Sequence, residues 1–265
     1  MKGKLDIKDF MKRLKSMLKV DFRRMFTMPL VYIMASVSLV IPILILVMTT
    51  MMGGMTMVDP NTGIETTMEG FTNVWQAIGS VSGVQMGMDI AGMCNINLLY
   101  FLIAVFVCIF VSEDFRSGYV KNLFTVRAKR MDYCVSKTAV CIAGGVIMIF
   151  MYFVGAMIGG KIAGLSFDTI GFGAGGIVAC LFSKIFLVAI FVSLALLLSV
   201  VGKQKLWISI LGSIGACALL FTMLPMISPL NSNMLNVIMT LAGGALFSVG
   251  LGAVSNLILN KTSLV

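Results

Sequence analysis

The residues with the most varied chemistry lie together in one internal segment, residues 112–137, where acidic, basic and aromatic side chains alternate. Glu113 and Asp114 begin a short helical pattern, where carboxylates favour the helix dipole, and Gly118 permits a bend. A docking surface for another protein needs such a mixture of charged and aromatic groups, whereas a simple connector does not. The residues predicted to form this surface are Glu113, Asp114, Phe115, Arg116, Ser117, Gly118, Tyr119, Asn122 and Leu123.

Other kinds of chemistry are excluded by residue type. The chain has no histidine, which rules out His-ligated haem, His-containing zinc sites and catalytic triads that use imidazole. Its six cysteines contain no CxxC pair and mostly lie in apolar runs, where cysteine acts as a small hydrophobic residue. The sequence has no P-loop and no basic patch interleaved with aromatic residues, so we expect no catalytic residue, metal, cofactor or nucleic-acid partner for this chain.

A second group of charges lies at the amino terminus, in residues 1–27. Two parallel stripes recur there at helical spacing, which predicts a basic amphipathic helix. Such a helix lies on anionic lipid headgroups, with roughly 1 kcal/mol gained per cation near the surface. The basic stripe is Lys8, Lys12, Lys15, Lys19 and Arg23, and the apolar stripe is Ile7, Met11, Leu14, Leu18, Phe22 and Met25.

The elements that position these charges are membrane spans, because 59% of the residues are hydrophobic and only 12% are charged. Long uncharged runs match the roughly 20 residues that a span requires, and Pro225 and Pro229 divide the last of them. We therefore predict an all-α polytopic membrane protein, with a domain over residues 28–260. Its six predicted spans cover about residues 28–52, 90–112, 138–160, 184–202, 206–225 and 234–259.

The distribution of cations predicts the orientation. Eighteen of the twenty Lys and Arg residues fall on one side of these spans, which the positive-inside rule assigns to the cytoplasm. We expect a multi-pass protein of the plasma (cytoplasmic) membrane with both termini in the cytoplasm. The first outer loop has no cation but carries Asp59, Glu65, Glu69 and Asp89, with Trp75 as a predicted interfacial anchor.

Two interpretations of Lys184 stay open at this point. In one, Lys184 marks the outer end of the fourth span. In the other, it lies inside the span as a functional charge and needs a partner such as Asp168. The Gly-rich stretch of residues 162–183 similarly fits either an interfacial or a re-entrant helix.

The internal segment resembles the first cytoplasmic loop of the permease subunits of type-2 ABC exporters. Its residues Glu113, Gly118, Leu123, Arg130 and Lys137 match that family's pattern in order. The resemblance implies that residues 113–124 form a coupling helix, which docks on a separate ABC ATPase present in two copies that bind ATP and Mg. It also implies a second, identical permease subunit. The cargo would be an amphipathic or hydrophobic molecule, best a peptide, as for the permeases that export phenol-soluble modulins.

Another class of function competes with this one. An ion-coupled transporter or channel would need no ATPase partner, but it usually places charged residues inside its spans. None of the predicted spans holds an acidic residue, and only Lys184 could serve. An intramembrane protease is disfavoured, because no membrane-embedded Asp pair or His-based site can be built from this sequence.

Overall fold

The structure is a computed structural model, and nearly all of the residues that it describes are helical. It describes residues 2–53, 56–58, 65–67, 70–79, 94–125, 129–169, 171, 173–203 and 205–261. The α-helices are α1 (Lys2–Thr27), α2 (Pro29–Met52), α4 (Leu99–Arg116), α5 (Tyr119–Thr125), α6 (Arg130–Ile162), α7 (Ala174–Gly202), α8 (Leu206–Phe221), α9 (Leu224–Ile227) and α10 (Met234–Lys261). The described residues also form two 3-10 helices and a short antiparallel strand pair. These are η1 (Val74–Ala77), η2 (Ile96–Leu98), β1 (Thr56–Val58) and β2 (Glu65–Thr67).

Five of the described helices are long and apolar enough to cross a membrane: α2, α4 together with η2, α6, α7 and α10. The chain is therefore an all-α multi-pass membrane protein, as predicted. Helix α8 has only 16 residues, which gives it a length of about 24 Å, against about 30 Å of hydrocarbon core. The predicted interruption near Pro225 is present, since α9 and a non-helical stretch separate α8 from α10.

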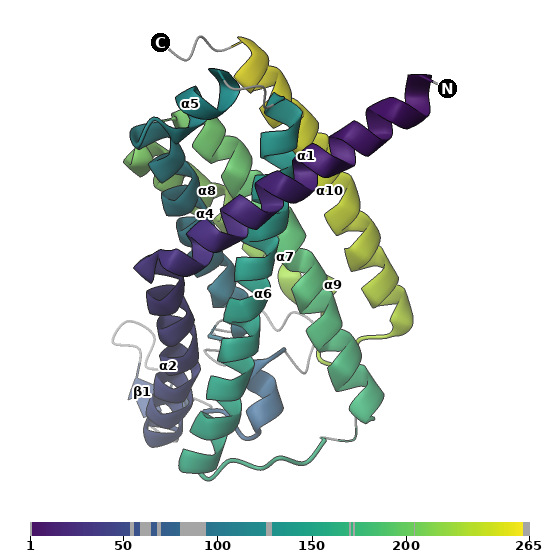
Figure 1. The fold of residues 1–265 in the computed structure, drawn as a ribbon. Coiled ribbons are helices and arrows are strands. Elements are labelled where there is room, and N and C mark those ends of the chain that lie inside the picture. Colours follow the sequence, from purple (N-terminus) through teal and green to yellow (C-terminus); the bar gives the residue numbers. More distant parts are fainter. Residues whose placement is uncertain are drawn as a thin grey trace.

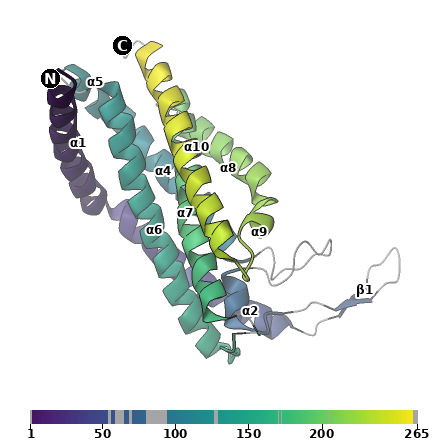
Figure 2. The same ribbon diagram turned by 90° about the vertical axis from the view of Figure 1, so that its right-hand side faces the viewer.

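The long helices run side by side as a bundle, and α1 crosses the bundle obliquely (Figures 1 and 2). The start of α1, the end of α10 and the short helix α5 all lie at one end of the bundle, which we call the basic end, whereas β1 lies at the opposite end. Exposed Arg116 and Lys121 belong to the basic end. Of the acidic residues predicted for the first outer loop, Glu65 is in β2, and Asp59, Glu69 and Asp89 lie outside the described residues.

Glycine allows α6 to approach α2 closely. A Cβ atom at Gly155 would collide with the carbonyl oxygen of Leu39, and one at Gly159 would lie 2.8 Å from the Cα atom of Ile43. The same holds between α10 and α7, where a Cβ at Gly244 would lie 2.9 Å from the carbonyl oxygen of Phe186. These small residues thus serve helix contacts within this chain.

Several helices extend beyond the predicted spans. Helix α2 agrees with its prediction, but α4 continues to Arg116, α6 already begins at Arg130, and α7 begins at Ala174. The stretch interpreted as an interfacial or re-entrant helix contains the first turns of α7. Lys184, interpreted either as the outer end of a span or as a charge inside it, lies well inside α7 and is fully buried.

Replacing Gly155 by alanine is expected to destabilise the protein by about 1–3 kcal/mol, because the added methyl group pushes α2 away from α6. The matched control is Gly250→Ala in α10, where a Cβ meets nothing within 4 Å. Because alanine has the better helix propensity, this variant should be as stable as the wild type or more stable by up to about 1 kcal/mol. Thermal unfolding in detergent can be followed with a thiol-reactive dye, since Cys108, Cys134, Cys141, Cys180 and Cys217 are free and buried. Equal midpoints for the two variants would contradict this helix contact.

Candidate functional site

The predicted docking segment divides into the end of α4, a turn and α5. Residues Glu113–Arg116 continue α4. The Ser117 hydroxyl donates to the Glu113 carbonyl oxygen at 2.7 Å. Gly118 then takes a positive φ of 71°, a backbone conformation that glycine adopts without strain. The chain therefore turns sharply at Gly118 and enters α5 at Tyr119.

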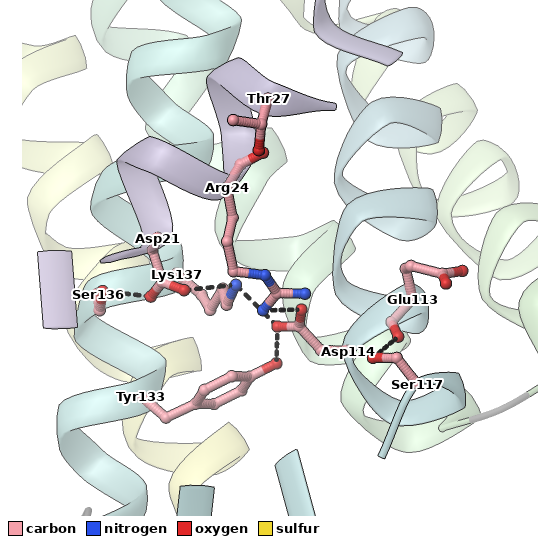
Figure 3. Close-up of polar contacts among 9 residues, drawn as sticks. All are labelled: Asp21, Arg24, Thr27, Glu113, Asp114, Ser117, Tyr133, Ser136 and Lys137. Atoms are coloured by element: carbon pink, nitrogen blue, oxygen red, sulfur yellow. Dashed lines mark hydrogen bonds and ion pairs between the residues drawn. The ribbon is translucent and has the colours of Figure 1, made fainter. Parts of the chain in front are cut away.

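Lys137 lies behind this turn, on α6, and its side chain has no exposure to solvent. Its Nζ atom is 2.8 Å from Oδ1 of Asp21 and 2.7 Å from Oδ2 of Asp114. It also lies 4.3 Å from the centroid of the Phe110 ring, close enough for a cation–π contact. Lys137 thus joins three helices, α1, α4 and α6, through one buried ammonium group (Figure 3).

The two carboxylates have further partners, so that each oxygen makes a polar contact. Ser136 Oγ donates to Oδ2 of Asp21 at 2.6 Å, and Tyr133 Oη donates to Oδ2 of Asp114 at 3.0 Å. The remaining Oδ1 of Asp114 lies 2.8 Å from a guanidinium nitrogen of Arg24. We call Asp21, Arg24, Asp114 and Lys137 the charge cluster. It contains two anions and two cations, so it can be buried without net charge.

Arg24 also links α1 to α5. Its guanidinium carbon lies 3.9 Å from the centroid of the Tyr119 ring, a cation–π distance. Burial disfavours the charged guanidinium, but Asp114 and Tyr119 outweigh this and raise the pKa of Arg24, so this residue stays charged. Burial, reinforced by Asp21, raises the pKa of Tyr119, so its phenol stays neutral. Nearer the start of α1, Arg13 Nε pairs with Oδ2 of Asp132 on α6 at 3.1 Å.

The predicted docking residues differ in their exposure. Arg116, Ser117 and Asn122 are exposed, and Glu113, Gly118, Tyr119 and Leu123 are half-buried. Asp114 and Phe115 are buried, so they support the segment from inside and offer no surface to another protein in this conformation. Residues 126–128, which follow α5, lie outside the described residues.

The basic stripe of α1 lies on the face of the helix that points away from the bundle. Lys12, Lys15, Lys19 and Arg23 are exposed, and the side chain of Lys8 lies outside the described part. The buried face is turned relative to the predicted apolar stripe: it consists of Met17, Asp21 and Met25, with Leu14, Leu18 and Phe22 partly covered. Met11, which belongs to the predicted stripe, is 57% exposed.

Asp21, Arg24, Tyr133 and Ser136 were not predicted as site residues. One signal could have identified Asp21, because it lies four residues from both Met17 and Met25 and therefore shares their helix face. A carboxylate on the apolar face of an amphipathic helix must find a partner when that face is buried. The sequence does not identify this partner, since Lys137 is far away along the chain.

Lys184 forms a second buried site, in the half of the bundle away from the basic end. Its Nζ donates to Oδ1 of Asn97, at 2.7 Å, and the hydroxyl of Tyr100 donates to the Lys184 carbonyl oxygen at 2.9 Å. The suggested partner Asp168 is exposed and accepts from the Ser166 hydroxyl at 2.8 Å. Within the described residues, Lys184 thus faces a neutral amide and not a carboxylate.

Trp75, predicted as an interfacial anchor, joins the segment after β2 to the stretch between α6 and α7. Its indole nitrogen donates to the carbonyl oxygen of Phe167 at 3.0 Å, and the Asn73 side chain donates to that of Asp168 at 2.7 Å. In the described part of the chain, no group of three or more Cys, Asp or Glu side chains could hold a metal ion.

Comparisons with protein-family profiles, curated proteins and solved structures found no match to this chain. The fold and the site themselves define a class: an all-α multi-pass membrane protein whose amphipathic first helix is tied by buried ion pairs to the basic end of its bundle.

Replacing Lys137 by methionine is expected to destabilise the protein by about 3–5 kcal/mol, because it leaves a buried carboxylate without a counter-charge. Adding Asp21→Asn should recover part of this loss, since the remaining Arg24–Asp114 pair is neutral. Lys121→Met, which removes an exposed cation, should change stability by no more than about 0.5 kcal/mol. The dye-based unfolding assay measures all three; a double variant less stable than Lys137→Met would contradict the charge-balance explanation.

Proposed function

We propose that this chain is the transmembrane permease subunit of a type-2 ABC exporter, powered by a separate ATPase subunit that binds ATP and Mg. The observation that supports this most is the construction of the basic end. There, a short exposed helix, α5, follows a tight turn and is held from inside by the charge cluster. A permease needs such a rigid projection, because a partner's movement must reach the spans.

The proposed coupling surface consists of Arg116, Ser117 and Asn122, with exposed Lys121 beside them. A displacement of α5 is transmitted to α1 through the Tyr119–Arg24 contact and to α6 through Asp114 and Lys137. Buried ionic contacts lose much of their energy when their geometry changes, so these helices are expected to move together. In this proposal residues 113–124 act as the coupling element, with Asp114 and Phe115 as its internal support.

The remaining parts of the proposal follow from topology and surface. The basic end faces the cytoplasm of the plasma membrane, so both termini are cytoplasmic, and α8 with α9 completes a sixth crossing. Two ATPase copies and a second, identical permease subunit complete the transporter. Helix α10 offers a face for this second copy: Leu235, Leu246 and Val249 are 68–74% exposed, and either lipid or protein must cover them. The cargo is an amphipathic or hydrophobic molecule, best a peptide.

Copurification tests the proposal directly. The tagged chain, isolated in mild detergent from its native host, is expected to bring an ABC ATPase with it. The double variant Arg116→Glu/Lys121→Glu should reduce the recovered ATPase by at least about tenfold, because reversed charges oppose docking. The matched control is Lys161→Glu, an exposed cation at the other end of the bundle, which should recover the ATPase normally. Absence of an ATPase from the wild-type sample would refute the proposal.

An ion-coupled transporter or channel is the second candidate, and one observation favours it: Lys184 is a buried charge within a predicted membrane-crossing helix. Charges in such positions often mark ion or substrate pathways. Vesicles that contain only this chain distinguish the candidates. The ABC proposal predicts no transport of an amphipathic peptide under an ion gradient without ATPase and ATP. Gradient-driven transport that Lys184→Met abolishes would favour the second candidate.

A further inference from the structure

Two buried lysines in this protein have different surroundings. Lys137 and Lys184 are both fully buried. Lys137 has two carboxylates and an aromatic ring around its ammonium group. Lys184 has the amide oxygen of Asn97, and no described carboxylate lies within ion-pair distance of it. The charge of Lys137 is therefore neutralised at the basic end. Lys184, in the other half of the bundle, has no counter-charge among the described residues.

Among the described residues, the Lys184 site has more hydrogen-bond donors than acceptors. An ammonium group carries three donor protons, and Asn97 accepts one of them. The Tyr100 hydroxyl cannot offer its proton to an anion here, because it donates to the Lys184 carbonyl oxygen. A positive site with unused donors is complementary to an anionic oxygen ligand.

The position of Lys184 indicates where this anion comes from. Lys184 is about 15 Å along α7 from its outer start, and its contacts Asn97 and Tyr100 precede and begin α4. One turn earlier on α7, the Cys180 thiol contacts the Ser228 carbonyl oxygen in the stretch after α9. The ammonium thus faces the interior of the bundle and not lipid, so a group carried through the bundle reaches it more readily than a lipid headgroup does.

We propose that Lys184 binds a carboxylate of the transported molecule, so that the cargo is an amphipathic molecule with an acidic group, such as the free carboxyl terminus of a peptide. This inference rests on the proposed transport function. Because Lys184 is covered in this conformation, the carboxylate reaches it when α4 and α7 separate. Asn97 holds the ammonium in place until then.

A pair of peptides tests the proposal. The probe is an amphipathic helical peptide of Leu, Ala and Lys with a neutral fluorescent group at its amino terminus, prepared with either a free carboxylate or an amide at its carboxyl terminus. Fluorescence anisotropy measures its affinity for the full chain in phosphatidylcholine nanodiscs. The carboxylate form is expected to bind at least about tenfold more tightly, as for one charge-assisted hydrogen bond. Lys184→Met should abolish this preference, whereas Lys161→Met should retain it.

Three results would overturn the proposal. The first is equal affinity of the two peptides for the wild-type chain, a result that does not depend on the folding of any variant. A preference that appears only in Asp89→Asn would show that an acidic residue of the chain itself, outside the described residues, neutralises Lys184. Lys184-dependent retention of phosphatidylglycerol without peptide preference would assign the lysine to a lipid headgroup. Because the assay contains no ATPase, its failure is distinguishable from failure of the copurification experiment.

Discussion

The ammonium group of Lys137 has no access to water, so its charge must be balanced by groups inside the protein. Asp21 and Asp114 supply this balance, and Arg24 neutralises the second carboxylate. These residues come from α1, α4 and α6, so none of the three helices can move far without exposing a buried charge to an apolar environment. The cluster therefore fixes the position of α1 across α4 and α6.

Close packing complements the charge cluster along the rest of the bundle. Gly155 and Gly159 bring α6 against the backbone of α2, and Gly244 brings α10 against α7. A polar contact also joins α4 to α8, where the Cys108 thiol and the Ser213 hydroxyl are 3.1 Å apart. Within the membrane these contacts replace the hydrophobic effect, which does not favour one apolar helix partner over lipid. The bundle is thus held by ion pairs at one end and by close helix contacts along its length.

The two buried lysines show how the same side chain can serve different purposes. Lys137 has two carboxylate partners and stabilises one arrangement of helices. Lys184 has one neutral partner among the described residues and therefore retains the capacity to bind an anion. In the proposed transporter these properties belong together: the basic end transmits force as a rigid unit, and the interior site exchanges its ligand when the spans separate.

The sequence by itself determined the class of the protein. Long uncharged runs require a lipid environment, which identified the helices of the bundle, and the amphipathic spacing identified α1 as a helix. It also identified Asp114 and Lys137 as notable residues, but treated them as parts of a polar loop. Helix ends were less predictable, because a span was assumed to stop at its first charged residue, whereas α4, α6 and α7 continue past Glu113, Lys137 and Lys184. Only the tertiary structure decided where these helices end, because a helix can bury a charge when a distant segment supplies its partner. Asp21 and Lys137, for example, meet across more than a hundred intervening residues.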